Sequence, residues 1–298
     1  MFHVEPMMNS NSSCPVCKGT LKKELDVKDH FLSQEDFEIL RCATCRLRKT
    51  NPAPSPLLIG RYYETEEYLS HGDDQKGLFA WLYRQAKKIN LSRKARLLNQ
   101  IAPHSHLLDF GCGTGDFIQY CQELGFQVRG AEPSEQALAH ASALVIDNII
   151  SPEEELASDT KYDVITMWHV LEHVHNPIDV LSRLMKKLNR NGHLIIAVPN
   201  PDSHDARHYG TYWAGWDVPR HLWHFEPHAM IKLANSINLT HITTHPMWLD
   251  AFYVSWLSER YKKGLAPLAL IRGFISNFRA LFAKKRRCSS QIYLFKAD

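Results

Sequence analysis

Residues 107–115 read Leu-Leu-Asp-Phe-Gly-Cys-Gly-Thr-Gly, and the rest of the chain can be placed relative to this stretch. An apolar run ends in an acid, and three glycines follow at alternate positions before Asp116. Beyond them, four positions recur at the spacing of one helix face: Phe117, Tyr120, Cys121 and Leu124. The pattern predicts a β-strand, a tight glycine turn and the beginning of a helix.

This arrangement is typical of a ligand site, because open parallel sheets bind ligands at the carboxyl ends of their strands. Glycines let the backbone approach the ligand without an intervening Cβ. The next apolar run, residues 126–131, ends in Glu132, whose carboxylate can accept both hydroxyls of a ribose. Dinucleotide folds carry G-x-G-x-x-G, whereas this turn is G-x-G-x-G followed by Asp116. An acid at that place opposes a phosphate and suits a cationic ligand better.

At residues 107–115, and at the Gly-Ala-Glu-Pro-Ser of residues 130–134, the chain resembles the class I S-adenosylmethionine-dependent methyltransferases. The resemblance implies S-adenosylmethionine as cofactor. It places the following residues around that cofactor: Asp109, Gly111, Cys112, Gly113, Gly115, Glu132, Pro133, Met167, Trp168 and His169. The alternative is a similar tight turn in another kind of α/β protein.

Residues 162–174 are a second match, a strand that leads into a short helix as in the same family. Glu172 and His173 follow one helical turn after the cofactor-lining positions, and we interpret His173 and His175 as surface or capping residues. The resemblance covers most of the chain from about residue 62 onward. It implies an α/β fold with a seven-stranded, mostly parallel Rossmann-like methyltransferase sheet, helices on both faces and an antiparallel last strand.

Three weaker features lie between these matches. We expect a helix over residues 135–144, a third strand over residues 145–150, and a turn at Asn191-Gly192 before a strand over residues 193–200. The nearly continuous apolar run of that last strand is typical of a strand that is covered on both faces.

Near the N-terminus, two CxxC pairs indicate a metal site. Cys14 and Cys17 form one pair and Cys42 and Cys45 the other, with 24 residues between the pairs. Four thiolates on two tight turns can surround zinc tetrahedrally, and such a closed set is structural rather than catalytic. Few apolar residues lie between the pairs, so the metal would supply much of the folding energy of a small zinc ribbon.

We place the domain boundary after a proline-rich linker, which gives a zinc-ribbon module over residues 1–56 and a methyltransferase domain over residues 57–298. The aromatic segment at residues 61–71 is either a flap over the cofactor or a docking segment between the domains. Within the second domain we expect an acceptor-side loop at residues 199–227 and a helical insertion at residues 249–287, before the last strand.

The loop at residues 199–227 is long for an α/β connection and is rich in histidine and tryptophan. Long loops at the carboxyl end of a sheet are commonly functional. Histidine can accept a proton near neutral pH, so His221 or His224 is our candidate general base, with Trp216 and Trp223 as an apolar wall. Asp217 or Arg220 would orient the base or an anionic acceptor. The alternative is that these side chains only pack the loop onto the sheet.

Composition limits the class of protein. A hydrophobic content of 44% and a charged content of 22% are globular values. No apolar run reaches the ~18 residues of a membrane span, and no signal peptide is evident. Seven cysteines with CxxC spacing indicate a reducing compartment, so we expect a cytoplasmic protein. Residues 265–287 form an apolar stripe with a basic end, which favours packing or, alternatively, peripheral membrane contact.

We therefore predict an enzyme that transfers methyl groups from S-adenosylmethionine to a hydroxyl or activated carbon of a small-molecule, glycan or lipid-like acceptor. One alternative is an RNA methyltransferase that holds nucleic acid with its ribbon and basic tail. The acids of the ribbon argue against it, so we expect no nucleic-acid partner. Another is a non-catalytic binding module, against which the intact Asp109 and Glu132 argue. The sequence does not indicate the oligomeric state.

Overall fold

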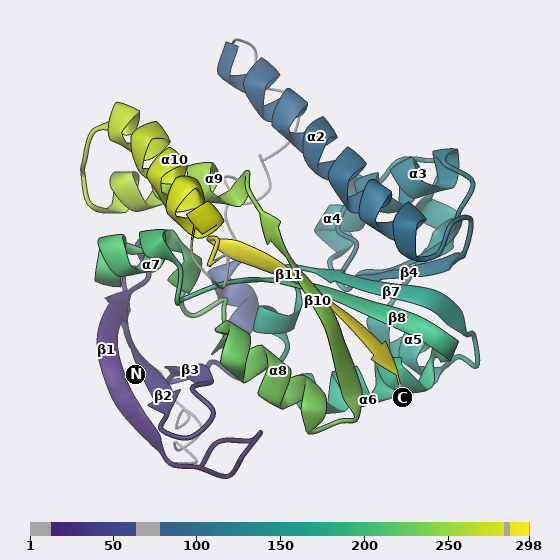
Figure 1. Cartoon of the computed structure of the whole chain (residues 1–298), viewed down its shortest axis with the longest axis horizontal. Helices are drawn as coiled ribbons and strands as arrows, with labels where there is room; N and C mark the ends of the chain where they lie inside the picture. Colours follow the sequence, from purple (N-terminus) through teal and green to yellow (C-terminus); the bar gives the residue numbers. More distant parts are fainter. Residues whose placement is uncertain (1–12, 64–77, 283–286, 298) are drawn as a thin grey trace, which may run out of the picture.

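The computed structural model describes residues 13–63, 78–282 and 287–297, and its centre is a seven-stranded sheet (Figure 1). The strand order is β10-β11-β8-β7-β4-β5-β6. The strands are β4 (His106–Phe110), β5 (Gln127–Ala131), β6 (Ile149–Ile150), β7 (Tyr162–Trp168), β8 (Leu188–Pro199), β10 (Leu239–Met247) and β11 (Ser290–Ala297).

The strand directions are those that the sequence predicts. β4 pairs in parallel with β5 and β7, and β7 pairs in parallel with β8. β11 runs antiparallel to both β8 and β10. The predicted fold class, a mostly parallel Rossmann-like sheet with an antiparallel last strand, is confirmed.

Alternate residues of the central strands enter two different cores, because successive side chains of a strand point to opposite faces. Leu107 of β4 packs on the face covered by α2 (Leu78–Ile101) and α3 (Asp116–Glu123). Its neighbour Leu108 packs on the opposite face, covered by α6 (Pro177–Lys186) and α8 (Pro227–Asn235). Helices thus cover both faces, and the carboxyl edge of the sheet is left for the connecting loops.

Side chains cap the beginnings of several helices. The hydroxyl of Ser151 and the carboxylate of Glu154 form a reciprocal capping box at α5 (Pro152–Ala157). Asn176 accepts a hydrogen bond from Asp179 N at the beginning of α6. The remaining helices are α4 (Glu135–Ala139), α7 (His204–Tyr209), α9 (Asp250–Tyr261) and α10 (Ala266–Phe282).

The N-terminal region is a small sheet of β1 (Leu21–Lys28), β2 (Asp36–Cys42) and β3 (Arg48–Asn51), which lies beside α8 in Figure 1. Its fourth strand, β9 (Trp223–His224), comes from the predicted acceptor-side loop. The zinc-ribbon region and the methyltransferase region also share one hydrophobic core, in which Leu47 and Phe225 both take part. The boundary at residue 56 stays a prediction, but the two regions are joined by a sheet and a core.

Local differences from the expected elements occur at three places. α4 ends at Ala139, before the expected end at residue 144. The third strand is reduced to Ile149–Ile150, because Ile146–Asn148 form a 3-10 turn instead. β8 begins at Leu188, and the residues expected as a turn lie in an irregularity of its pairing with β7.

Candidate active site

The glycine turn between β4 and α3 adopts the conformation that its sequence predicts. Gly111, Gly113 and Gly115 all have positive φ angles, of 80°, 56° and 79°. A side chain at Gly111 would meet Val170 Cγ2 at 2.4 Å, and one at Gly115 would meet Val145 Cγ2 at 3.0 Å. A side chain at Gly113 would meet no described atom within 4 Å. Gly111 and Gly115 therefore serve packing and backbone conformation, and Gly113 presents the open side of the turn.

Glu132 holds this turn to the end of β5. Its Oε2 accepts a hydrogen bond from Gly113 N at 2.8 Å, and its Oε1 accepts one from Ser134 N at 2.9 Å. A carboxylate offers about four acceptor positions, so each oxygen keeps a lone pair for a further donor. The residues present therefore fit a ligand with two adjacent hydroxyls beside the open side of Gly113.

Asp109 lies beneath the turn and is buried. Its Oδ1 accepts a hydrogen bond from Thr166 Oγ1 at 2.6 Å. Burial raises the pKa of Asp109 to about 7, although the Thr166 hydrogen bond and the charge of Lys94 act in the opposite direction. Asp109 is thus partly protonated near neutral pH, and its position is fixed from the neighbouring strand β7.

The other residues that the sequence places around the cofactor have different environments. Met167 is fully buried in the core on the α6 and α8 face, so it offers no surface to a ligand. Trp168 packs edge-on against Phe117, with Lys94 Nζ 4.4 Å from the centre of its ring. Cys112 is half-buried and Pro133 is exposed.

His169 follows Trp168 and adopts a positive φ of 58°. Its Nε2 lies 3.0 Å from Asp250 Oδ2, and its Nδ1 lies 3.3 Å from Glu172 Oε1. Burial alone would lower the pKa of His169, but the two carboxylates outweigh it and raise that pKa to about 10. The ring is therefore cationic at neutral pH. Asp250 begins α9, and sequence analysis missed it because 81 positions separate the two residues.

Two of the loop residues proposed for the acceptor side pack against the ribbon instead of forming an open wall. Trp216 is buried, and its Nε1 donates to Gly210 O at 2.9 Å. Trp223 is also buried, and its Nε1 donates to Val174 O at 2.9 Å. Both tryptophans thus stabilise the loop at residues 199–227.

His224, one of the two candidate bases, faces the ribbon. Thr50 Oγ1 donates its single hydrogen to His221 O at 2.6 Å and lies 3.0 Å from His224 Nε2. Because that hydrogen is already used, His224 Nε2 must donate to Thr50 and carries a proton. Burial, with the nearby positive charges, holds the pKa of His224 well below its ordinary value. Its Nε2 is not free to accept a proton.

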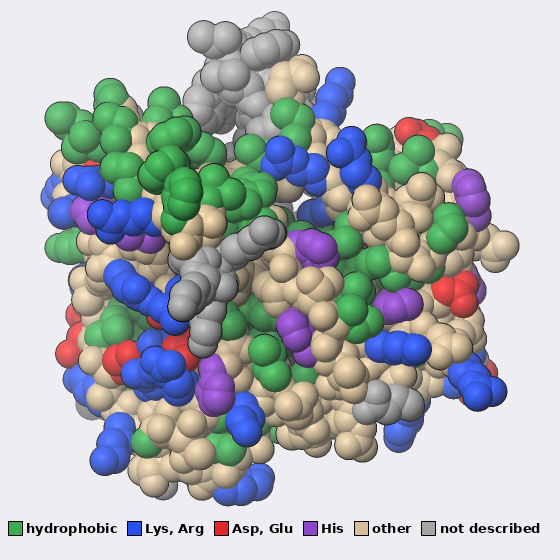
Figure 2. Space-filling view, in the orientation of Figure 1, with side chains coloured by type: hydrophobic (Ala, Val, Ile, Leu, Met, Phe, Trp, Pro, Cys, Tyr) green, Lys and Arg blue, Asp and Glu red, His purple; other side chains and the backbone are tan. Residues whose placement is uncertain are grey.

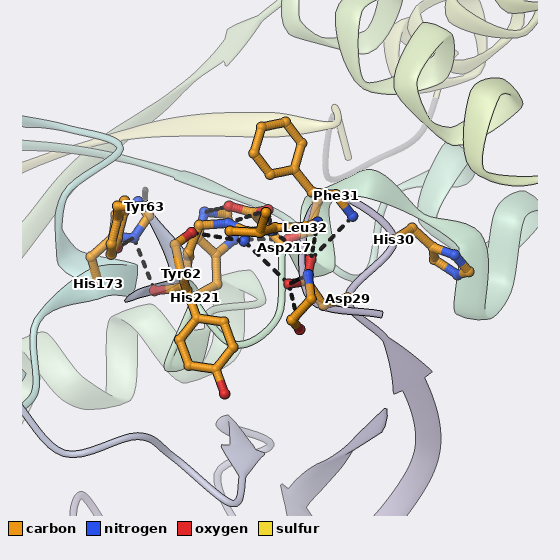
Figure 3. A network of polar contacts seen from close by, with 12 residues as sticks. Asp29, His30, Phe31, Leu32, Tyr62, Tyr63, His173, Asp217 and His221 are labelled. Atoms are coloured by element: carbon orange, nitrogen blue, oxygen red, sulfur yellow. Dashed lines mark hydrogen bonds and ion pairs between the residues drawn. The ribbon is translucent and has the colours of Figure 1, made fainter. Parts of the chain in front are cut away.

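The carbonyl of His221, the other candidate, also contacts the ribbon, but its ring lies beside that of His173. The centres of the two rings are 4.7 Å apart. His173 also contacts the hydroxyl of Tyr63, with 3.0 Å between that oxygen and His173 Nδ1 (Figure 3). The interpretation of His173 as a surface or capping residue is therefore wrong, whereas His175 is exposed and bonds Pro54 O.

Arg220 joins the loop to the ribbon. Its guanidinium is buried, with Nη2 at 3.0 Å from Asp29 Oδ1 and at 2.6 Å from Asp217 Oδ1. It also donates to Tyr62 O at 3.1 Å. Arg220 and Asp217 thus pair with each other, and the pair holds the loop against the ribbon. Residues 61–63 dock between the two regions, and residues 64–71 of the same predicted segment lie outside the described residues.

The four ribbon cysteines converge as the CxxC spacing predicts. The Sγ atoms of Cys14 and Cys45 are 3.4 Å apart, as are those of Cys17 and Cys42, and all four lie within 4.8 Å of one another. Tetrahedral zinc with bonds of about 2.3 Å needs sulfur atoms roughly 3.8 Å apart. The donor set and its dimensions fit zinc.

Comparison with known proteins decides the family. A family model described as a methyltransferase domain matches residues 80–244, which is more than half of the chain. The chain belongs to this family. The match contains the glycine turn, Glu132 and residues 162–174, so the family predicted from these residues is confirmed.

Among curated relatives, a ubiquinone biosynthesis O-methyltransferase of Bradyrhizobium diazoefficiens is 31% identical over 123 residues, which are 39% of this chain and 48% of that protein. A mitochondrial one of Schizosaccharomyces pombe is 35% identical over 100 residues, 30% of this chain and 36% of that protein. The chain therefore spans about half the length of the first of these relatives and about a third of the second.

A solved structure of similar fold is that of the [4+2]-cyclase SpnF, with a TM-score of 0.53 and 14% identity over 82% of this chain and 97% of that chain. This likeness shows the fold alone, and a fold by itself does not determine an activity. Among the described residues, we find no helix with the length and apolarity that crossing a membrane requires. The cytoplasmic localisation stays a prediction.

Proposed function

We propose that this chain transfers the methyl group of S-adenosylmethionine to a hydroxyl or activated carbon of a small acceptor. The observation that carries the proposal is the pairing of Glu132 with the glycine turn, in a member of the methyltransferase-domain family. The free acceptor positions of Glu132 suit the ribose hydroxyls, and the open side of Gly113 gives the cofactor room beside the backbone.

Methyl transfer is an in-line displacement at a sulfonium. The chain must align the acceptor with the methyl group and exclude water, and a hydroxyl acceptor must also lose a proton. Of the two predicted bases, the geometry favours His221, because Nε2 of His224 already donates to Thr50. The names of the curated relatives support a hydroxyl, rather than a carbon, as the acceptor.

Titration calorimetry with S-adenosylmethionine, S-adenosylhomocysteine and NAD tests the cofactor. We expect micromolar binding of the two sulfur compounds and at least a tenfold loss of affinity in Glu132→Gln. Glu135→Gln is the matched control, since Glu135 is exposed three residues further on. Binding of NAD alone, or unchanged affinity in Glu132→Gln, would contradict the proposal.

A lipid-like acceptor is supported by α10, which has an unusual distribution of side chains. The inner face of the helix carries small residues, all of them buried: Ala269, Gly273, Ser276 and Ala280. Its outer face carries large exposed apolar side chains: Leu270, Ile271, Phe274, Phe278, Leu281 and Phe282. Figure 2 shows hydrophobic side chains gathered over α9 and α10.

The charge around α10 indicates what covers this face. From residue 259 to the end, the sequence has ten Lys or Arg and two acids, a balance of +8, and four of the basic residues follow the helix at 284–287. An apolar helix face with a basic flank suits the surface of an anionic membrane. We therefore propose that α10 lies on such a surface and that the acceptor is a lipid-like molecule.

Co-sedimentation with vesicles tests this membrane contact. We expect binding to vesicles of anionic phospholipid that weakens at high salt, and at least a tenfold loss of binding in the double variant Phe274→Ser/Phe278→Ser. Leu124→Ser/Leu144→Ser is the control, because these exposed leucines lie outside the insertion. Equal binding by the two double variants, or no binding of the unmodified chain, would contradict the contact.

The nucleic-acid alternative has less support. Lys23 Nζ pairs with Asp26 at 2.7 Å and with Glu38 at 2.9 Å, and Lys28 Nζ pairs with Asp36 at 3.0 Å. These basic side chains of the ribbon are thus already matched by acids of the same sheet.

A further inference from the structure

Three potential ligands converge on the acceptor side of the sheet, away from the ribbon cysteines. Glu172 and His173 lie in the single 3-10 turn after β7 (Leu171–His173), and His221 comes from the loop at residues 199–227. One ligand atom from each lies within 4.8 Å of the other two. The topology therefore brings together residues that are almost 50 positions apart in the sequence.

Both imidazoles are held in the tautomer that leaves Nε2 able to bind a metal. His173 Nδ1 lies 2.9 Å from Arg220 O, and His221 Nδ1 lies 3.0 Å from Gly215 O. A carbonyl oxygen only accepts hydrogen bonds, so each Nδ1 carries the ring hydrogen. The lone pair of each neutral ring is therefore on Nε2. Metal-binding histidines commonly donate their second ring nitrogen to a carbonyl in this way.

The carboxylate of Glu172 is buried, and neither of its oxygens has a hydrogen-bond partner among the described residues. His169 Nδ1 lies 3.3 Å from Oε1, but this contact lacks hydrogen-bond alignment. A buried anion without hydrogen bonds is costly. His169 thus gives Glu172 an ion-pair contact on one side only, and both carboxylate oxygens keep lone pairs that a cation at the cluster would engage.

We propose that Glu172, His173 and His221 bind a divalent cation. Two imidazole nitrogens and one carboxylate oxygen are a donor set that suits first-row transition metals such as Zn²⁺, Fe²⁺ and Mn²⁺. Three protein ligands leave coordination positions open, in contrast to the closed set of four ribbon cysteines. Asp217 Oδ2, 3.8 Å from His221 Nε2, lies beside the cluster.

The role of this cation rests on the proposed function, although its binding does not. At an open position, the cation would bind the acceptor hydroxyl and lower its pKa. The hydroxyl proton passes to water, the oxygen forms a bond to the methyl carbon, and the carbon–sulfur bond breaks. The sulfonium then becomes a neutral thioether. In this arrangement His221 acts as a metal ligand instead of as the general base, and water accepts the proton.

Titration of the full chain with Mn²⁺ alone, followed by the electron paramagnetic resonance signal of free Mn²⁺, tests the site. Mn²⁺ prefers oxygen and nitrogen donors to thiolates, so the ribbon can keep its own metal. We expect one equivalent of Mn²⁺ to bind, with at least a tenfold loss of affinity in Glu172→Gln and in His221→Gln. His175→Gln is the control, because this neighbouring histidine is exposed outside the cluster.

Calorimetry with S-adenosylhomocysteine on the same variants separates loss of the site from loss of the fold. Retained S-adenosylhomocysteine binding with lost Mn²⁺ binding supports the cation site. No Mn²⁺ binding by the unmodified chain, or equal affinity in Glu172→Gln, would overturn the site and leave the proposed methyl transfer intact. If Mn²⁺ binds but S-adenosylhomocysteine does not, the proposed function fails while the cation site stands.

Discussion

The glycine turn at residues 111–115 follows β4, and the loop at residues 199–227 follows β8, so both lie at the carboxyl edge of the parallel strands. They are held in place in different ways. The turn is held by the end of the next strand, β5, with Ala131 O and Glu132 accepting its amide hydrogens. The loop is held by the ribbon, through β9 in the small sheet and Arg220 on Asp29. Cofactor binding thus depends on local geometry, whereas the acceptor side depends on tertiary docking.

Removal of the ribbon metal should give the largest difference between the two regions: the acceptor side should lose its function while cofactor binding is retained. With a strong chelator, or in Cys42→Ser, we expect the ribbon to unfold, because structural zinc can supply about 10 kcal/mol of folding energy. Methyl transfer and Mn²⁺ binding should fall at least a hundredfold, because the loop loses β3 and Asp29. Calorimetry should show S-adenosylhomocysteine affinity within about threefold of the unmodified chain. A parallel loss of that affinity would show that the turn also depends on the ribbon.

Arg220→Met should have the next largest effect, since it leaves the buried carboxylate of Asp29 and the half-buried carboxylate of Asp217 without their shared cation. Breaking a buried ion pair from one side costs about 3–5 kcal/mol, which urea unfolding would measure. Arg190→Met, at an exposed position, is the control and should change stability little. A loss for Arg220→Met as small as that of the control would mean that the ion pair does not hold the loop.

Within the turn, two alanine substitutions should act differently. Gly111→Ala should lower the free energy of unfolding by about 3 kcal/mol, because the new methyl group would approach Val170 closely and the backbone has a positive φ. Gly113→Ala should lower the free energy of unfolding by only about 1 kcal/mol, from the positive φ. It should nevertheless weaken S-adenosylhomocysteine binding at least tenfold. Thermal unfolding and calorimetry give the two quantities. The assignment of Gly113 to the cofactor side is wrong if Gly113→Ala binds S-adenosylhomocysteine normally.

The smallest expected effect concerns Asp109 and pH. Its pKa is raised from 3.8 to about 7 in the folded chain, so folding favours the protonated carboxyl. This contribution to stability is complete below about pH 4 and is lost as the pH rises to about 7. Asp109→Asn keeps an acceptor for Thr166 and should gain about 1 kcal/mol over the unmodified chain between about pH 6 and pH 7, roughly 2–4 °C in melting temperature. A difference that does not change with pH would contradict the raised pKa.

The sequence by itself determined the elements whose signals are local. The strand, the glycine turn and the beginning of α3 follow from residues 107–124, and the convergence of four thiols follows from two CxxC pairs. The sheet directions came with the family resemblance. These features depend on backbone conformation and on spacing along the chain, which the sequence records directly.

Only the tertiary structure decided the acceptor side. Asp250 reaches His169 from α9, Asp29 reaches Arg220 from the ribbon, and His221 reaches Glu172 from a loop. These partners are many positions apart, and no periodicity connects them. Met167 illustrates the same limit, because β7 turns its side chain into the core rather than toward a ligand. Spacing specifies a turn or a strand, but the docking of two regions determines which charges are buried together.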